Sequence, residues 1–270
     1  MLTALTRDVS RSLSSCELEY LTPQEIDVDK AIAQHQRYKQ ALANLGLRVI
    51  SMRSESDLPD GVFVEDAAVA LEEVAVITTM GSPEREKEVE SFAKAMSYFR
   101  PLRYLRKPAK LEGGDVLRVE RTLYVGLSSR SDHLGIEQLS AAVKPFGYSV
   151  VPVRVLSCLH LKTGCCYLGD NTILANTSWI DTAPLRDFRI IGVHADEPWA
   201  SNVLRVSDTI LASSRFPKTI AILEKEGYNV SQIDISELMK AEAGLTCLSV
   251  IFESNMPMPM DVVSGYLFPE

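Results

Sequence analysis

A cysteine near the C-terminal end of the chain lies in a stretch whose residue types allow two interpretations. Residues 243–253 read AGLTCLSVIFE, and the apolar, β-branched run after Cys247 predicts a buried strand. Gly244 permits a bend that would take the cysteine out of regular strand pairing. Free cysteine is among the most frequently buried residue types, so this stretch alone favours a buried thiol over a nucleophile.

Polar residues interrupt the starts of other predicted strands in a similar way. Marking one in each segment gives steps of 49, 45, 42 and 45 residues along Asp66, Asp115, His160, Asn202 and Cys247. A nearly constant period of this length indicates repeated supersecondary units, although elements of similar length could produce it by coincidence. If the repeat is real, equivalent positions meet at one axis, and these scattered side chains form one pocket.

The elements that must position these residues alternate between helices and strands. Helical patterns occur at 28–45, 83–98, 133–145 and 217–226. Short apolar strands lie between them, among them RVISM, TLYVGL, SVVPV, TILAN, RIIGV, TILAS and SVIF. This alternation predicts an α/β fold.

Composition excludes several functional classes. The 270 residues are 46% apolar, enough for a sizeable core, and carry a net charge of -8 without a basic cluster typical of nucleic-acid binding. The apolar runs are too short for a membrane span, and Arg7 and Arg11 interrupt any secretory signal. Five cysteines without a CxxC pair argue against structural zinc and for a reducing, cytoplasmic location. Cys165 and Cys166, followed by Tyr-Leu, are expected to pack in a strand.

Several motifs together resemble one known family. VEDAAV, LEGGDV, HLKT and GLTCLSV, with PDGVF, SPEREKEVE and YVGLSSR, resemble the dimethylarginine dimethylaminohydrolases in order and spacing. The resemblance runs from about Arg7 to Phe252. It implies a five-bladed α/β propeller, the pentein fold, with pseudo-fivefold ββαβ units around a central pocket. We expect a single domain over residues 1–270, in which residues 253–270 form a tail that covers surface.

The resemblance also implies roles for individual residues. The family's nucleophile falls on Cys247, its general acid/base on His160, and the carboxylate that orients the histidine on Glu112. The family's substrate-binding positions fall on a further set: Leu18 in a flexible covering loop, Asp60, Glu65, the guanidinium-binding Asp66, the carboxylate-binding Arg85 and Arg130, and the backbone carbonyl of Ala241. Thr163 and Leu248 are mild departures from the family pattern. The resemblance implies a small-molecule substrate, no cofactor or metal, and leaves the oligomeric state open, with a homodimer as one option.

Each of these residue types also has a structural explanation. An isolated histidine in an apolar segment is usually a satisfied core residue, and acidic pairs or Gly-Gly-Asp are common in turns. Arg85 lies in a highly charged helical pattern where a surface position is the default. Arg130 follows a strand and could cap a loop, and Asn202 is expected to serve in a turn. Only their joint occurrence in the repeat and in the family pattern favours a catalytic site.

The implied reaction is hydrolysis of a guanidinium. A thiolate attacks the central carbon, the histidine protonates the departing amine, and water releases citrulline from the covalent adduct. Lys162 favours methylated arginine, because the related arginine deiminases have an aspartate there that binds the far guanidinium nitrogen. A dimethylated nitrogen has no N–H for such a carboxylate. An arginine deiminase or dihydrolase, an amidinotransferase, and a non-enzymatic binding module on the same fold remain the alternatives.

Overall fold

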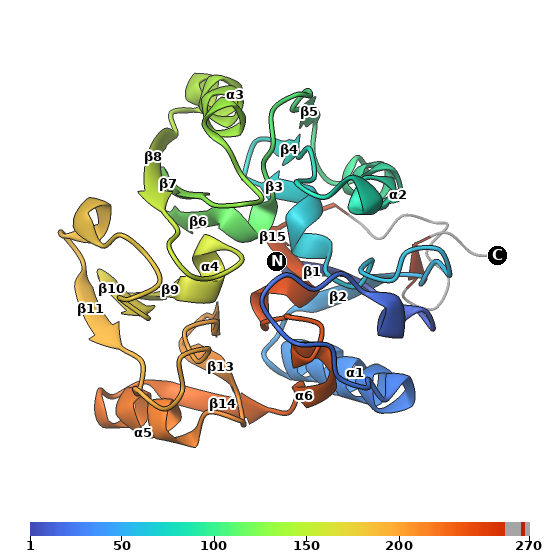
Figure 1. Ribbon diagram of the computed structural model, residues 1–270. Helices are drawn as coiled ribbons and strands as arrows, with labels where there is room; N and C mark the ends of the chain where they lie inside the picture. Colours follow the sequence, from blue (N-terminus) through green and yellow to red (C-terminus); the bar gives the residue numbers. More distant parts are fainter. Residues whose placement is uncertain (257–265, 268–270) are drawn as a thin grey trace.

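The chain forms five small sheets arranged around a centre (Figure 1). The computed structural model describes residues 1–256 and 266–267. Four units follow one another along the chain: β3 (Ala68–Ala70), β4 (Ala75–Ile77), α2 (Lys87–Met96) and β5 (Leu102–Tyr104); β6 (Val116–Val119), β7 (Thr122–Leu127), α3 (His133–Val143) and β8 (Ser149–Arg154); β9 (Cys165–Gly169), β10 (Thr172–Ala175) and β11 (Arg189–Gly192); β12 (Leu204–Val206), β13 (Thr209–Ser213), α5 (Pro217–Lys225) and β14 (Asn229–Ile233).

The fifth unit joins the two ends of the chain. Its strands are β15 (Val250–Glu253), β1 (Leu2–Arg7) and β2 (Arg48–Met52), and α1 (Val28–Asn44) connects the last two. β15 is antiparallel to β1, so the C-terminal part supplies the first strand and the N-terminal part supplies the two that follow it. The short strand β16 (Tyr266–Leu267) pairs with the outer edge of β2.

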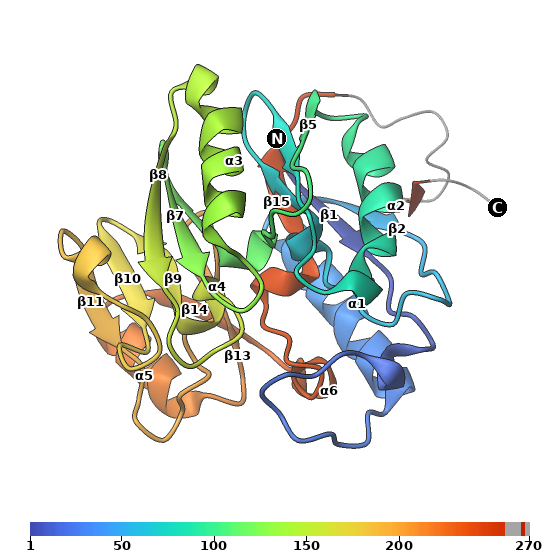
Figure 2. The same ribbon diagram turned by 45° about the horizontal axis from the view of Figure 1, so that its top comes forward.

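All five sheets share one topology. The first and second strands are antiparallel, and the second and third are parallel, which requires a crossover connection. The crossover helices lie outside, while the first strands lie nearest the centre (Figures 1 and 2). The predicted five-bladed α/β propeller is confirmed.

The third unit departs from the expected ββαβ pattern. Residues 176–188 connect β10 to β11 through one short 3-10 turn, η6 (Ala183–Leu185), instead of an α-helix. This stretch reads NTSWIDTAPLRDF, and its threonines, aspartates and proline favour turns over a helix. Trp179 packs edge-on against Trp199 beside it.

The predicted helices agree closely with α1, α2, α3 and α5. Among the described strands, β1, β5, β14 and β16 escaped the sequence patterns. β5 has three residues and β16 has two, while β1 (LTALTR) and β14 (NVSQI) each contain three polar residues. The expectation that residues 253–270 cover surface falls largely outside the described residues.

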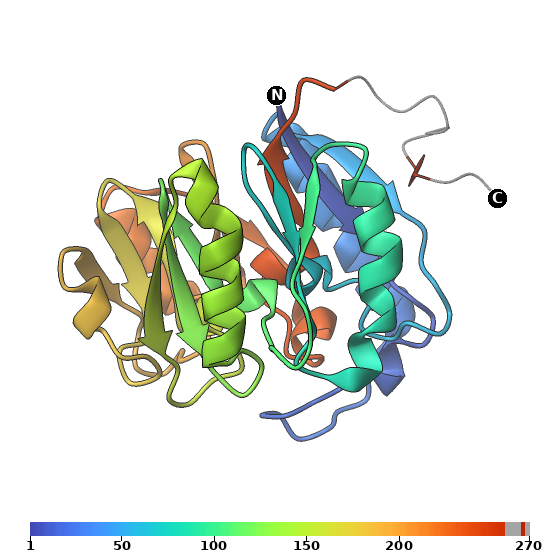
Figure 3. The same cartoon turned by 90° about the horizontal axis from the view of Figure 1, so that it is seen from above.

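The core consists of several clusters of buried side chains. They lie between the sheets and helices whose arrangement Figure 3 shows from above. The cluster beneath α1 includes Tyr38 and Leu42 and reaches Leu245 and Leu248 near the C-terminus. Because these residues come from both ends of the chain, packing of α1 positions the segment that precedes β15. Within the described ranges, none of the helices has the length and apolarity needed to cross a bilayer.

Candidate active site

Short helical turns precede the first strands and meet at the centre of the ring. They are η2 (Val64–Ala67), η4 (Gly113–Asp115), α4 (Leu161–Gly164) and η7 (Thr246–Leu248). Side chains at the repeat positions accept backbone N–H groups from the next unit. Asp66 accepts from Gly114 at 3.0 Å, Asp115 from Leu161 at 2.8 Å, and Asn202 from Thr246 at 3.1 Å. The repeat positions therefore join the units at the axis.

One pocket brings most of the predicted residues together. Its wall is formed by Glu17, Asp60, Phe63, Asp66, Arg85, Arg130, Leu159, His160, Ala241, Glu242, Ala243 and Cys247. Glu112 is fully buried behind His160. Leu18 and Glu65 are not part of this wall.

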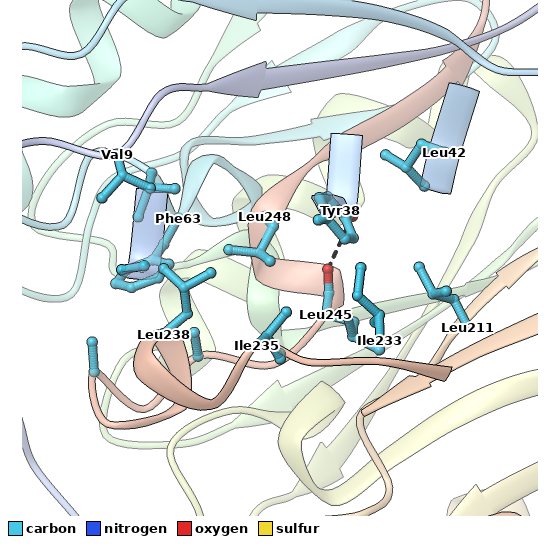
Figure 4. Close-up of a cluster of buried hydrophobic side chains, with 14 of the residues drawn as sticks. Val9, Tyr38, Leu42, Phe63, Leu211, Ile233, Ile235, Leu238, Leu245 and Leu248 are labelled. Atoms are coloured by element: carbon cyan, nitrogen blue, oxygen red, sulfur yellow. Dashed lines mark hydrogen bonds between the residues drawn. The ribbon is translucent and has the colours of Figure 1, made fainter. Parts of the chain in front are cut away.

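Cys247 lies in η7, before β15 begins. Leu245 and Leu248 on either side are buried, and the Gly244 N–H points at the Cys247 Sγ at 3.3 Å. The Tyr38 hydroxyl donates to the Leu245 carbonyl at 3.1 Å, which ties the turn to α1 (Figure 4). The 3-10 turn thus holds the thiol outside the strand and in the pocket wall. Gly244 leaves room for the Asn202 side chain, which a Cβ would approach to 2.2 Å.

The surroundings of Cys247 oppose formation of the thiolate. Burial raises the pKa of the thiol, and the carboxylates of Glu65 and Asp66 raise it further. The Gly244 N–H and the Lys162 ammonium lower the pKa by less. A cation bound beside the sulfur would reverse this balance.

His160 and Glu112 form a buried hydrogen-bonded pair. The His160 Nε2 lies 2.6 Å from Glu112 Oε2, and the Glu112 Oε1 accepts the Gly81 N–H at 2.8 Å. Burial lowers the pKa of His160, but the charge of Asp66 and the Glu112 hydrogen bond outweigh it and raise the pKa to about 9. Burial opposes ionisation of Glu112, yet the His160 partner holds its pKa at about 2. The pair can store a proton next to the thiol.

Besides the Gly114 N–H, Asp66 has two ionisable partners. Its Oδ2 accepts from Arg85 Nη1 at 2.8 Å, and its Oδ1 lies 3.9 Å from His160 Nε2. Arg85 also donates to both oxygens of Glu88, at 3.0 and 2.8 Å. The surface position that is the default for Arg85 is wrong, because its guanidinium is buried among these acids. Asp60 lies nearby, and burial raises its pKa to about 6.

Residues 17–21, which we call the lid segment, begin at Glu17 in the wall of the pocket. Arg130 donates to Glu19 Oε2 at 3.0 Å and to Glu17 Oε2 at 3.5 Å. The Glu17 N–H donates to Asp60 at 3.2 Å, and Ser82 donates to Glu17 at 2.7 Å. Leu18 is half-buried between these two glutamates.

The structure directs Glu65 away from this pocket, contrary to its expected position beside Asp66. Its carboxylate pairs with Lys162 and accepts from the Thr246 hydroxyl at 2.8 Å. Burial raises the pKa of Glu65, and the Lys162 ammonium opposes that rise. Glu65 and Lys162 line a separate cavity together with Arg118 and Arg205. Successive side chains in a turn point in different directions, so Glu65 and Asp66 serve opposite sides of the axis.

Sequence reasoning missed several residues that build the site. Asn202, interpreted as turn structure, also donates to Thr246 Oγ1 at 3.1 Å and to the Lys162 carbonyl at 2.9 Å. Its place in the repeat was the available signal. Tyr38 and Glu242 had no such signal, because their partners lie about 200 residues away in sequence.

Asp66, Glu112 and His160 are the group that could share a metal ion among the residues described. One ligand atom from each lies within 4.8 Å of the others. All three side chains already have partners in the protein: Asp66 pairs with Arg85, and Glu112 bonds both His160 and the Gly81 N–H. The arrangement of thiol, imidazole and carboxylates suits nucleophilic attack on a cationic carbon centre.

Comparisons with known proteins agree with this geometry. The sequence model of the family described as N,N dimethylarginine dimethylhydrolase, eukaryotic, matches residues 18–247. The N(G),N(G)-dimethylarginine dimethylaminohydrolase of Streptomyces coelicolor is 34% identical over 248 residues, covering 92% of this chain and 95% of that protein. The protein of that name from Pseudomonas aeruginosa is 32% identical over 228 residues, covering 84% and 90%.

Solved structures show the same likeness. A Pseudomonas aeruginosa dimethylarginine dimethylaminohydrolase, solved as a cysteine-to-serine mutant with citrulline, has a TM-score of 0.89 at 30% identity. The match covers 93% of this chain and 100% of that one. The N-terminal domain of ArgZ, a cyanobacterial arginine dihydrolase, has a TM-score of 0.81 at 20% identity, covering 94% and 98%. At that identity the likeness shows the fold alone.

Proposed function

The chain belongs to the dimethylarginine dimethylaminohydrolase family, and we propose that it hydrolyses Nω-methylated arginines to citrulline and methylamine or dimethylamine. One observation carries the proposal: Cys247, the His160–Glu112 pair and Asp66 face one pocket. A binding module would not need a nucleophile, a stored proton and a cation-binding carboxylate in one place.

Each polar group of a bound arginine has a partner among the residues around the pocket. Asp66 takes the guanidinium through charge-assisted hydrogen bonds. Arg130, at the mouth, takes the α-carboxylate, with Arg85 deeper in the wall as its neighbour. Asp60 and the carbonyls of Leu18 and Ala241 surround the α-ammonium. The enclosed acidic wall around Asp60 and Asp66 supports a cationic substrate over a neutral one.

Attack begins with the thiol of Cys247. Asp66, one of the two acids that raise this pKa, draws the guanidinium in, and the bound cation then stabilises the thiolate. The thiol proton passes to solvent, sulfur forms a bond to the central carbon, and the C=N π electrons move onto nitrogen as the carbon becomes tetrahedral. Substrate binding and activation of the nucleophile are therefore one event.

His160 completes the first half of the reaction as a general acid. It donates its proton to the substituted nitrogen, the C–N bond breaks, and the amine departs, leaving an S-alkylthiouronium on Cys247. The neutral imidazole then removes a proton from water, which attacks the same carbon. Breakage of the C–S bond yields citrulline and the free thiol. Glu112 positions the ring and stabilises its cationic form.

Lys162 supports methylated arginine as the preferred substrate. Its ammonium pairs with Glu65 and lies outside the pocket wall. This position therefore lacks the second carboxylate that would bind the far nitrogen of arginine. A dimethylated nitrogen has no N–H, and an unpaired buried carboxylate there would cost a few kcal/mol. The pocket is suited to a nitrogen that carries methyl groups.

The proposal extends to organisation and location. The five units act as one hydrolase domain, and the five free thiols fit a cytoplasmic location. Fractionation of cells tests the location. A homodimer is proposed as the assembly, and sedimentation of the purified chain tests it.

Citrulline formation from asymmetric dimethylarginine and from arginine, measured side by side, tests the activity. We expect turnover of the methylated substrate and its loss in Cys247→Ser. Preference for arginine would support a dihydrolase instead. Transfer of the amidino group to an added amine would support an amidinotransferase, and binding without any product would support a binding module.

A further inference from the structure

Glu242 receives an unusual set of hydrogen bonds from the lid segment. One oxygen, Oε1, accepts the backbone N–H groups of Glu19, Tyr20 and Leu21 at 3.0, 2.6 and 2.6 Å. We propose that Glu242 is a positioning residue that holds the lid segment over the pocket and thereby sets the affinity for substrate. The effect on affinity rests on the proposed function, whereas the effect on the lid segment does not.

The chemistry of the contact suits a permanent anchor. Successive backbone N–H groups that converge form a concave site for an anion. Hydrogen bonds to a carboxylate are shorter and stronger than those to a neutral oxygen. Three such bonds to one atom fix the backbone of three consecutive residues, and Leu18 directly precedes them.

The backbone of Glu242 is held by a hydrogen bond to the helix that precedes it. Glu242 has a φ of 60°, and its N–H donates to the Met239 carbonyl at the end of α6 (Ser236–Met239) at 3.1 Å. α6 is docked on α1, since Gln34 bonds Ser236 at 2.9 Å and accepts the Glu237 N–H at 2.9 Å. The lid segment passes beside α6 in both views (Figures 1 and 2).

Other contacts of the lid segment use groups that the substrate needs. Glu17 and Glu19 occupy Arg130, and the Glu17 N–H occupies Asp60. The α-carboxylate and α-ammonium of an arginine compete for these two residues. Glu242 is not assigned to either group, so its three bonds persist when substrate displaces the others.

Glu242 also links the lid segment to the nucleophile. It lies in the pocket wall between Ala241 and Ala243, five residues before Cys247. The next glycine, Gly244, donates to the Cys247 Sγ. A lid segment attached here stays in register with both the thiol and the Ala241 carbonyl.

Amide hydrogen exchange of the whole chain, read on peptides spanning the lid segment, tests the anchor directly. In Glu242→Ala we expect exchange at Glu19–Leu21 to rise about tenfold or more. Glu242→Gln keeps an acceptor of the same shape and should give a smaller rise, which keeps the test valid if the alanine variant folds poorly. The control is Glu226→Ala, because Glu226 forms an exposed ion pair with Arg189 outside the pocket.

Kinetics on the same variants test the effect on affinity. In Glu242→Ala we expect KM for methylated arginine to rise about tenfold while kcat changes less than about threefold. Unchanged exchange at Glu19–Leu21 would overturn the anchor whatever the activity. Raised exchange with unchanged KM would overturn the role in affinity. Absence of turnover in the unmodified chain would instead overturn the proposed function, and the exchange result would still decide on the anchor.

Discussion

Glu112 is the residue on which the charge of His160 depends. In Glu112→Gln the hydrogen bond can persist, but the negative charge that favours the imidazolium is lost. We expect kcat to fall about 100-fold or more with little change in KM, because positioning and charge at a general acid contribute on this scale. Steady-state kinetics with the methylated substrate measure it. A fall smaller than threefold would mean that Asp66 alone keeps the proton on His160.

The same histidine makes stability depend on pH. Its pKa is raised from 6.5 to about 9 in the folded chain. Its stabilising contribution of about 3 kcal/mol is therefore complete below pH 6.5 and is lost as the pH rises through about 9. Urea unfolding between pH 6 and pH 10 should show this decline. His160→Gln should remove that part of the pH dependence, and an equal slope in both proteins would contradict the assignment.

At the residue scale, the sequence predicted which residues are candidates for the site better than it predicted where their side chains point. Cys247, His160 and Asp66 could be found because the repeat and the family motifs coincide on them. The direction of Glu65, toward Lys162 and Thr246, could not be predicted, since one residue along a 3-10 turn changes the side of the axis. Glu17, Glu19 and Glu242 carried no pattern, because their roles depend on contacts between distant segments.

Tyr38 connects α1 with the turn that bears the nucleophile. Its hydroxyl bonds the Leu245 carbonyl at 3.1 Å and lies 2.7 Å from the Ser249 hydroxyl. Tyr38→Phe keeps the ring but leaves these buried partners without their bond. We expect the free energy of unfolding to fall by about 1–3 kcal/mol in chemical denaturation. Tyr104→Phe, at an exposed ring, is the control and should leave stability unchanged.

Gly114 marks a close approach of two units at the axis. A Cβ there would lie 2.6 Å from His160 Nδ1 and 2.7 Å from Asp66 Oδ1. We expect Gly114→Ala to displace both side chains and reduce kcat/KM about 100-fold. Gly192→Ala, where a Cβ meets nothing within 4 Å, should leave the rate unchanged. Similar rates in the two variants would show that the axis can relax around a methyl group.

At the element scale, periodicity located the long helices because each has a clear apolar face. It missed β1, β5 and β14, whose short or polar sequences gain their strand structure from pairing with neighbours. The missing helix of the third unit follows from its turn-forming residues. The sequence therefore predicted the repeat, while the departure of one unit from it became visible only in the structure.

The closure of the ring predicts tolerance to circular permutation. Ser254 donates to the Met1 carbonyl at 2.9 Å, so the start of β1 and the end of β15 are adjacent. A flexible linker from Glu270 to Met1, with new ends between the exposed Ala195 and Asp196, should give a folded chain. We expect citrulline formation within about tenfold of the original rate, and thermal unfolding measured in parallel should show a folded chain. New ends within β7 should abolish folding, and equal failure of both would contradict the prediction.

The pairing of β1 with β15 has a consequence for synthesis, because the ribosome makes the two strands at different times. β1 emerges first, but its antiparallel partner β15 emerges after all the other units, so one edge of β1 stays open throughout synthesis. Cys247 directly precedes that partner, and the thiol leaves the ribosome only as the ring is about to close. A half-made chain therefore has the acids but no nucleophile, and catalytic competence arrives in one step with the last strand. Any chain that stops short of Cys247 lacks the proposed nucleophile and presents the edge of β1 to other molecules.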